Sequence, residues 1–341
     1  RETFPTTAAL NWYPKHQVKA LQQIQNGLHH VDLVIEVRDA RIPFTSANPQ
    51  FEQILAARHR IIVFSKADLA HPHHQPLIRA AFAKWAPRET VLFTESRLPP
   101  GTRARPAIRQ LVRSIRELAL ADPARFPYLQ ALIVGLPNVG KSTLTNALRQ
   151  AGATGGARKS AKVGPTAGVT TAIATRVKIT SDPDIYLVDT PGILDPRALT
   201  RGQQTGGGSR GLTPDEALKL TVTGATNDAI TDEIHAADYL LFRLNQIPAL
   251  QGIYPALLGL PGPTNDIDTV LGAIGQRHRY TYFRPRGVTP KALFPTTLSG
   301  SPEARRLEGI DVERAARHFL HMYRDGQLGR MTLDDLRPEA I

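Results

Sequence analysis

The residues best suited to chemistry form a glycine-rich run at 135–142, which reads Gly-Leu-Pro-Asn-Val-Gly-Lys-Ser. It matches the G-x-x-x-x-G-K-[ST] pattern of a phosphate-binding loop, and it stands between an apolar run and a helical pattern, as that loop requires. Lys141 is expected to reach the β- and γ-phosphates of a nucleotide and to act catalytically there, and Ser142 is expected to bind Mg²⁺. The other contacts of this loop are expected from Asn138, Val139, Gly140 and Thr143.

Two further segments are predicted to complete the phosphate end of the site. Asp189 ends an apolar run and is followed by Thr-Pro-Gly, so we expect it to hold Mg²⁺ through water. Gly192 is expected to offer its N–H to the γ-phosphate. A threonine within residues 164–171 must supply a second Mg²⁺ ligand in the triphosphate state, and Thr170 is predicted, with Thr171 as the alternative.

Base recognition is predicted from Ser65, Lys66 and Asp68, which lie in front of the phosphate loop and close the apolar run 60–64. Asp68 is expected to accept the two N–H groups of guanine, which adenine lacks, so GTP and GDP are favoured over ATP. Lys66 should lie along the base. Ser65 stands where asparagine is usual, and its shorter side chain predicts a modest guanine affinity. Ser96 is a further candidate, through its backbone N–H and guanine O6.

The elements that must position these residues alternate between strand and helix as far as residue 190. Strands are expected near 33–37, 61–64, 90–93, 132–134, 177–179 and 185–188, and helices near 17–30, 75–85, 106–120 and 141–150. This alternation predicts an α/β domain with a mostly parallel sheet covered on both faces. After residue 213 the pattern is largely helical, with candidates at 214–223, 232–244, 266–276 and 312–324. We therefore expect a nucleotide-binding domain over 1–200 and a smaller helical domain over 213–341.

The order of these motifs resembles that of the circularly permuted GTPases of the YlqF type, which include the mitochondrial ribosome-associated GTPases. In an ordinary GTPase the base-recognition segment follows the phosphate loop, whereas here it precedes it. The resemblance runs clearly over about residues 10–245. It is carried by residues 12–16 (Trp-Tyr-Pro-Lys-His), 37–43 (Val-Arg-Asp-Ala-Arg-Ile-Pro), 65–68, 135–142, 168–170 (Gly-Val-Thr), 189–194 (Asp-Thr-Pro-Gly-Ile-Leu) and 221–225 (Thr-Val-Thr-Gly-Ala).

The resemblance implies a Rossmann-like P-loop GTPase domain and a helical domain that contacts ribosomal RNA during maturation of the large subunit. It places Ile193 where many GTPases carry a water-orienting glutamine, and isoleucine cannot orient water. The family's substitute is a histidine that maps to His16, although Lys15 replaces the glycine expected before it. Asn138 matches a family position linked to K⁺, and the alternative is that Asn138 only braces the loop.

The charge of the chain points to an anionic partner. Residues 1–192 carry 25 Lys and Arg against 13 Asp and Glu, whereas residues 193–341 carry 17 of each. Nucleic acid is the first candidate for such a surface, and a basic protein without an anionic partner is the alternative. Two basic segments are candidate RNA contacts: the arginines 105, 109, 113 and 116, which follow a helical spacing, and residues 277–286, which interleave arginines with aromatics.

These observations favour a GTP-hydrolysing assembly factor for the large ribosomal subunit, which binds rRNA in a nucleotide-dependent way as a monomer, with other assembly factors as further partners. The alternative is a non-catalytic rRNA-binding scaffold with a degenerate GTP pocket. The chain has no cysteine, which excludes disulfides, and no apolar run of membrane-spanning length is found. The high arginine content favours the mitochondrial matrix, with bacterial cytoplasm as the alternative.

Overall fold

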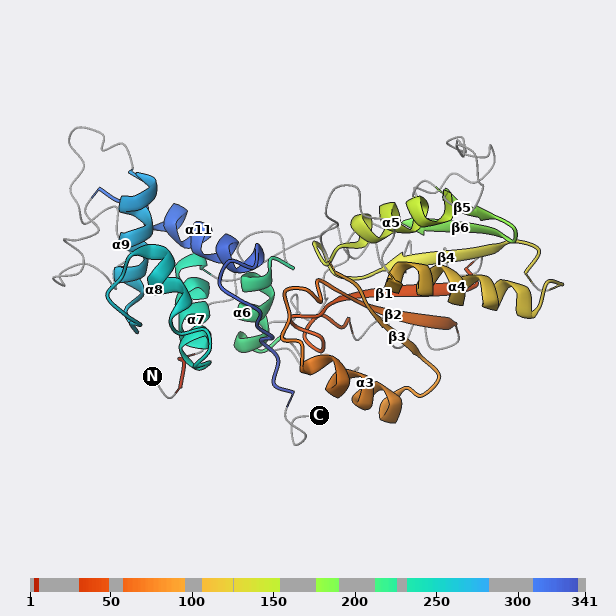
Figure 1. Cartoon of the computed structure of the whole chain (residues 1–341), viewed down its shortest axis with the longest axis horizontal. Coiled ribbons are helices and arrows are strands. Elements are labelled where there is room, and N and C mark those ends of the chain that lie inside the picture. Colours follow the sequence, from red (N-terminus) through yellow and green to blue (C-terminus); the bar gives the residue numbers. More distant parts are fainter. Residues whose placement is uncertain are drawn as a thin grey trace, which may run out of the picture. The chain divides into compact units, whose positions relative to one another are not determined.

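A computed structural model describes residues 3–5, 31–48, 58–95, 106–124, 126–153, 176–189, 212–225, 232–281 and 309–336 (Figure 1). These residues divide into two compact units. The sheet unit contains residues 31–189 of the described chain together with 212, 225 and 330–336, and the helical unit contains residues 3–5, 213–224, 232–281 and 309–329. Within the described residues, none of the helices combines the length and the apolar character needed to cross a membrane.

The sheet unit is built on a six-stranded sheet with the order β3-β2-β1-β4-β6-β5. The strands are β1 (Leu33–Asp39), β2 (His59–Ser65), β3 (Thr90–Phe93), β4 (Leu129–Val134), β5 (Arg176–Ser181) and β6 (Asp184–Asp189). The pairings β1–β2, β1–β4, β2–β3 and β4–β6 are parallel, and β5 pairs with β6 in the antiparallel direction. The prediction of a mostly parallel sheet is therefore confirmed.

Three described helices cover this sheet: α3 (His74–Trp85), α4 (Pro106–Ala121) and α5 (Lys141–Ala153). The chain moves outward from β2 to β3 through α3 and returns from β3 to β4 through α4. Because such crossovers are right-handed, this reversal places α3 and α4 on opposite faces of the sheet. α4 follows from its sequence, since Ile108, Leu111 and Ile115 recur at helical spacing and are all buried.

The reversal of direction also fixes where a ligand can bind. The chain winds to one side of β1 through β2 and β3, and to the other side through β4 and β6. In open sheets of this kind, ligands bind beyond the carboxyl ends of the strands at the point where the winding reverses. That point lies between β1 and β4, where β1 ends at Asp39, β2 ends at Ser65 and the phosphate loop follows β4.

The helical unit consists, in its described part, of α6 (Pro214–Thr223), α7 (Glu233–Asn245), α8 (Ile253–Leu258), α9 (Ile267–His278) and α11 (Val312–Arg324). α11 packs against α6, α7 and α9. Local signals set the helix ends: Thr213 and Glu216 form a reciprocal capping box at the start of α6, and Gly224 ends that helix with a positive φ of 71°. Asp232, Asp266 and Asp311 cap the three other long helices.

The observed division differs from the expected domains at both ends of the chain. Phe4 packs against the rings of Tyr239 and Phe242 in the helical unit, with centroids 5.3 and 5.4 Å apart. Residues 330–336 belong to the sheet unit, where Leu336 joins the core around Ile62 and Phe64. The expected domains, 1–200 and 213–341, assume that the chain passes between the two units once. Instead, Phe4 packs in the core of the helical unit and Leu336 packs in the core of the sheet unit.

Candidate nucleotide-binding site

The phosphate loop leaves β4 at Gly135 and enters α5 at Lys141, as the sequence predicts. Gly135 has a φ of +149°, and a Cβ at this position would lie 2.3 Å from the carbonyl oxygen of Val37 on β1. No other residue fits so close an approach of two backbone segments. Asn138 also has a positive φ, of 54°, and Gly140 has a φ of +100°. The loop therefore turns tightly and directs the first N–H groups of α5 towards the carboxyl edge of the sheet.

The side chains of the loop divide into a buried lysine and exposed polar groups. Lys141 is buried, and its ammonium donates hydrogen bonds to the carbonyls of Leu136 at 2.7 Å and Gly135 at 3.2 Å. Asn138, Ser142 and Thr143 are exposed, whereas Val139 is buried. This arrangement gives an anion a positive charge within the loop and hydroxyl groups at the helix N-terminus, which suits a phosphate chain with a divalent cation.

The base-recognition segment lies beside the phosphate loop, although the residues in contact are 72 and 74 positions apart in sequence. The ammonium of Lys66, a residue with a positive φ of 55°, donates to the carbonyl of Asn138 at 2.7 Å. The hydroxyl of Ser65 lies within hydrogen-bonding distance of the carbonyls of Val139 and Arg38. Since a hydroxyl carries one hydrogen, it donates to one of them at a time. Ser65 thus ties the base segment to the phosphate loop, a role that its small size permits at a buried position.

Asp68 follows in a turn that hydrogen bonds hold against β2 and β3. The N–H of Ala67 donates to the carbonyl of Thr94 at 3.0 Å, and the N–H of Thr94 donates to the carbonyl of Phe64 at 2.8 Å. The N–H of Leu69 donates to the carbonyl of Lys66 at 3.0 Å and closes the turn. Asp68 is therefore presented from a rigid backbone, half-buried, at the same edge as the phosphate loop.

Asp39 and Arg41, which the sequence analysis did not assign to the site, stabilise the same edge. The Asp39 carboxylate accepts from Arg41 Nε at 3.0 Å and Nη2 at 2.7 Å, and it pairs with Lys66 Nζ at 3.0 Å. Burial would raise the pKa of Asp39, but Arg41 and Lys66 outweigh it and hold that pKa well below its usual range. The position of Asp39 in the sequence could have indicated this role, because Asp39 ends a buried strand at the edge where β2 and β4 also end.

The remaining predicted site residues are only partly covered by the structure. Asp189 ends β6, where its Cα pairs in register with that of Ile133 on β4, so its backbone is at the carboxyl edge beside the phosphate loop. His16, Ser96, Thr170 with its alternative Thr171, and Gly192 lie outside the described residues. Their roles remain predictions.

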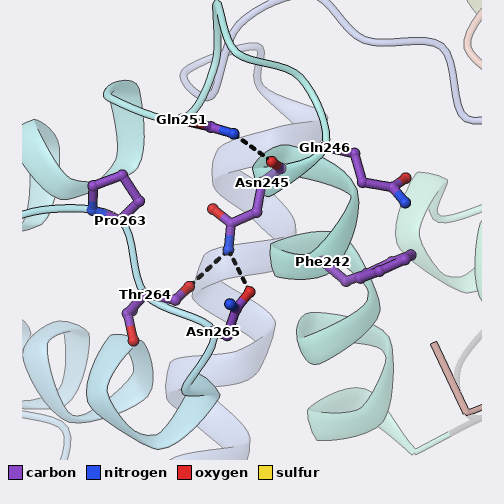
Figure 2. Close-up of a pocket in the computed structure, with 7 residues that line it drawn as sticks. All are labelled: Phe242, Asn245, Gln246, Gln251, Pro263, Thr264 and Asn265. Atoms are coloured by element: carbon purple, nitrogen blue, oxygen red, sulfur yellow. Dashed lines mark hydrogen bonds between the residues drawn. The ribbon is translucent and has the colours of Figure 1, made fainter. Parts of the chain in front are cut away.

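A hollow of about 200 Å³ lies in the helical unit between α7 and the segment before α9. Figure 2 shows that Asn245 points into it and that its amide donates to the carbonyl of Thr264 at 2.7 Å and to Asn265 Oδ1 at 3.2 Å. Its volume is below the 300–1,000 Å³ or so that is usual for small-molecule sites. We interpret this hollow as a structural one, in which Asn245 braces the connection to α9.

The comparisons with known proteins concern the chain as a whole. Residues 130–248 match the family model described as 50S ribosome-binding GTPase. Mitochondrial ribosome-associated GTPase 1 of Mus musculus is 34% identical, over 98% of this chain and 93% of its own length. Mitochondrial GTPase 1 of Schizosaccharomyces pombe is 30% identical, again over 98% of this chain and 93% of its own length.

Among solved structures, GNP-bound YlqF from T. maritima superposes with a TM-score of 0.50 at 21% identity, over 94% of this chain and 99% of that one. This likeness shows a shared fold, including the permuted order of the motifs. The predictions of a permuted P-loop fold, of guanine-nucleotide binding and of GTP hydrolysis are thereby confirmed. The chain belongs to the family of mitochondrial GTPase 1, also named mitochondrial ribosome-associated GTPase 1.

Proposed function

We propose that this GTPase assists assembly of the large subunit of the mitochondrial ribosome, in the matrix, and that it binds rRNA as a monomer while GTP is bound. The observation that carries this proposal is the nearly full-length likeness to mitochondrial ribosome-associated GTPase 1. The description of the matching family as 50S ribosome-binding supports a large-subunit partner. Other assembly factors are candidate partners on the same particle.

At the phosphates, Lys141 and the N–H groups of the loop would neutralise the charge that develops during transfer of the γ-phosphoryl group to water. Ser142 and Asp189 would hold Mg²⁺, which supplies positive charge to the β- and γ-phosphate oxygens when it is bound. Asn138, exposed at the outer turn of the loop, is the candidate ligand for a K⁺ ion. His16 remains the candidate for orienting water, since Ile193 cannot do so.

Replacing Asp68 by asparagine tests the assignment of guanine recognition. An asparagine can accept only one of the two guanine N–H groups, and its own amide N–H₂ faces the other, so affinity for GDP should fall by about 100-fold or more. Xanthine carries a carbonyl in place of the guanine amino group, so xanthosine diphosphate should bind the variant more tightly than GDP. Fluorescence titration with the labelled diphosphates measures both constants. Equal loss of both nucleotides would argue against a contact between Asp68 and the base.

A face of α4 is the better-placed candidate for rRNA in the sheet unit. Arg109, Arg113 and Arg116 are all exposed on it, whereas Ile108, Leu111 and Ile115 of the same helix are buried. The three guanidinium groups therefore line one solvent-facing side, where they can contact successive backbone phosphates and release counterions. Arg105, the first member of the predicted stripe, lies outside the described residues.

We expect the triple variant Arg109→Gln, Arg113→Gln and Arg116→Gln to weaken rRNA binding by about tenfold or more at physiological salt. The slope of log affinity against log salt should become shallower by roughly 2–3, because each lost phosphate contact contributes about 0.7–0.9. The control variant Lys84→Gln, Arg88→Gln and Arg149→Gln removes the same charge from other exposed positions. If both variants lose affinity equally, net charge rather than this face governs binding.

The helical unit offers a second candidate RNA surface at the end of α9. His278 stacks on Tyr280 with centroids 5.5 Å apart, and the guanidinium of Arg314 lies 4.4 Å from the centroid of the Tyr280 ring. The Tyr280 hydroxyl also bonds to Nδ1 of His318 at 2.9 Å, which holds this ring against α11. The exposed His278 and Arg314 are thus among the groups that RNA would meet on this surface. Residues 282–286 lie outside the described part of the chain.

Co-sedimentation with purified mitochondrial large subunits tests the proposed partner. The full-length protein should pellet with the subunit in the presence of a non-hydrolysable GTP analogue, and it should remain largely in the supernatant with GDP. Linkage then requires that the subunit raise the preference of the protein for the analogue over GDP. The factor equals the ratio of the subunit affinities measured with the two nucleotides. Binding that is equal with both nucleotides would contradict nucleotide control, and the absence of binding would contradict the partner.

A further inference from the structure

The last described segment of the chain, residues 331–336, forms a clasp on the base-recognition edge of the GTPase site. It follows the helical unit in sequence, since Gly329 is the last residue of that unit. The N–H of Met331 donates to the carbonyl of Leu69 at 3.1 Å, one residue after Asp68. The N–H of Leu333 donates to the carbonyl of Arg41 at 2.7 Å. The clasp therefore bonds to the loop that carries Asp68 and to the turn that follows β1.

Apolar burial fixes the clasp in place. Met331 and Leu333 are fully buried, and Leu336 belongs to the core cluster that contains Ile62, Phe64 and Phe82. A short irregular segment forms few hydrogen bonds of its own, so this burial is what keeps its polar groups in register with their partners. The clasp is part of the folded sheet unit.

Asp334 is the polar centre of the clasp, and it is buried. Its carboxylate accepts hydrogen bonds from the N–H of Phe44 at 2.8 Å, the N–H of Thr45 at 2.9 Å and the hydroxyl of Thr45 at 2.6 Å. Hydrogen bonds to an ionised acceptor are roughly twice as strong as neutral ones. A single side chain from the end of the sequence thus fixes the turn that follows β1.

That turn is connected through Asp39 to Lys66, the lysine of the base-recognition segment. Ser46, the residue after Thr45, accepts the N–H of Asp39 on its hydroxyl at 3.1 Å. Asp39 in turn pairs with Arg41 and with the ammonium of Lys66. Asp334 is therefore connected to Lys66 by hydrogen bonds to the turn, by the backbone of Thr45 and Ser46, and by Asp39. The Met331 N–H bonds to the loop that carries Lys66 and Asp68, at Leu69.

We infer that Asp334 is a positioning residue for guanine recognition, which acts through the 39–46 turn on Lys66 and Asp68. Its role is to hold the two base-contacting side chains in the geometry that distinguishes guanine from bases lacking the 2-amino group. The selectivity of the site is then set in part by a segment that is far from it in sequence and that directly follows the helical unit. This inference rests on the assignment of Asp68 to guanine, which Asp68→Asn tests separately.

Nucleotide selectivity in the full-length protein tests this inference. We compare the dissociation constants of GDP and inosine diphosphate, which lacks the 2-amino group and so uses only one of the two Asp68 bonds. Asp334→Ala should raise the GDP constant by about tenfold and reduce the preference for GDP over inosine diphosphate. Asp334→Asn should retain most of the GDP affinity and most of the preference for GDP. The asparagine amide oxygen can still accept the two N–H groups, and its amide nitrogen can donate to the Thr45 hydroxyl. Asp335→Ala, which removes the same charge at the exposed neighbour, should leave both constants unchanged.

A purely structural role makes a different prediction. In that case Asp334→Ala lowers the melting temperature but leaves the GDP constant and the preference over inosine diphosphate at their wild-type values, and the inference is wrong. Where Asp334→Ala does not fold, Thr45→Ala removes only the hydroxyl bond to the same carboxylate. It should shift both quantities in the same direction by about threefold, the effect of one hydrogen bond, and an unchanged preference would overturn the inference.

Discussion

Replacement of Lys141 by alanine should lower kcat/KM for GTP by about 10²–10³-fold or more, the range found when one preorganised donor to developing charge is removed. The ammonium lies inside the loop and bonds to the carbonyls of Gly135 and Leu136. From there it can turn towards an anion with little reorganisation. Lys141 is the one charged residue of the 135–142 loop, so no other side chain of the loop can replace its positive charge.

The matched control for this prediction is Arg149→Ala, which removes an exposed positive charge from the same helix, two turns further along. It should change kcat/KM less than twofold. Single-turnover hydrolysis with saturating protein separates the chemical step from binding. A Lys141→Ala variant that is folded and turns over GTP at the wild-type rate would show that another group carries the phosphate chemistry.

Replacement of Asp39 by alanine should destabilise the protein by about 3–5 kcal/mol, because it leaves the charge of Arg41 buried without its carboxylate. Asp39 and Arg41 are 0% and 1% exposed, so water cannot replace the lost partner. Nucleotide affinity should fall as well, since Lys66 loses the same carboxylate. Calorimetric unfolding and GDP titration measure the two effects.

The double variant Asp39→Ala with Arg41→Leu is the matched comparison. Removing both partners avoids the unpaired charge, so the double variant should be more stable than Asp39→Ala alone. The pH dependence follows from the depressed pKa of Asp39. A carboxylate of this kind stabilises the fold fully above its unfolded pKa, so the stability difference between wild type and Asp39→Ala should be constant between about pH 5.5 and 8. It should shrink only as the pH falls below about 4. A difference that vanishes near neutral pH would contradict this account of the pair.

Element types were predictable wherever local pattern and tertiary packing agree. The expected helices at 214–223 and 312–324 and the strand at 90–93 have the observed bounds. The short helix α8 was missed, since it has six residues, includes Pro255 and shows no extended periodicity. The antiparallel direction of β5 follows from its short connection to β6, because only residues 182 and 183 separate the two strands and two residues can join only antiparallel neighbours.

The site was predictable where one motif carries its own geometry and less so where distant segments meet. The phosphate loop required a strand, glycines and a helix in sequence, and the structure has them. The hydrogen bonds from Ser65 and Lys66 to the phosphate loop depend instead on the strand order, in which β2 and β4 flank β1. The pattern of residues along the sequence does not give that order. The clasp at 331–336 had no signal at all, because its backbone partners are carbonyls and N–H groups of other segments, which are present in every sequence.

The proposal that this GTPase acts on the large ribosomal subunit is tested most directly by steady-state GTP turnover. The full-length protein is assayed in K⁺ buffer with and without purified mitochondrial large subunits, and Na⁺ in place of K⁺ serves as the control for the cation. The account predicts stimulation by the subunit of about tenfold or more, lost in the Lys141→Ala variant. Turnover that is the same with and without the subunit would contradict it.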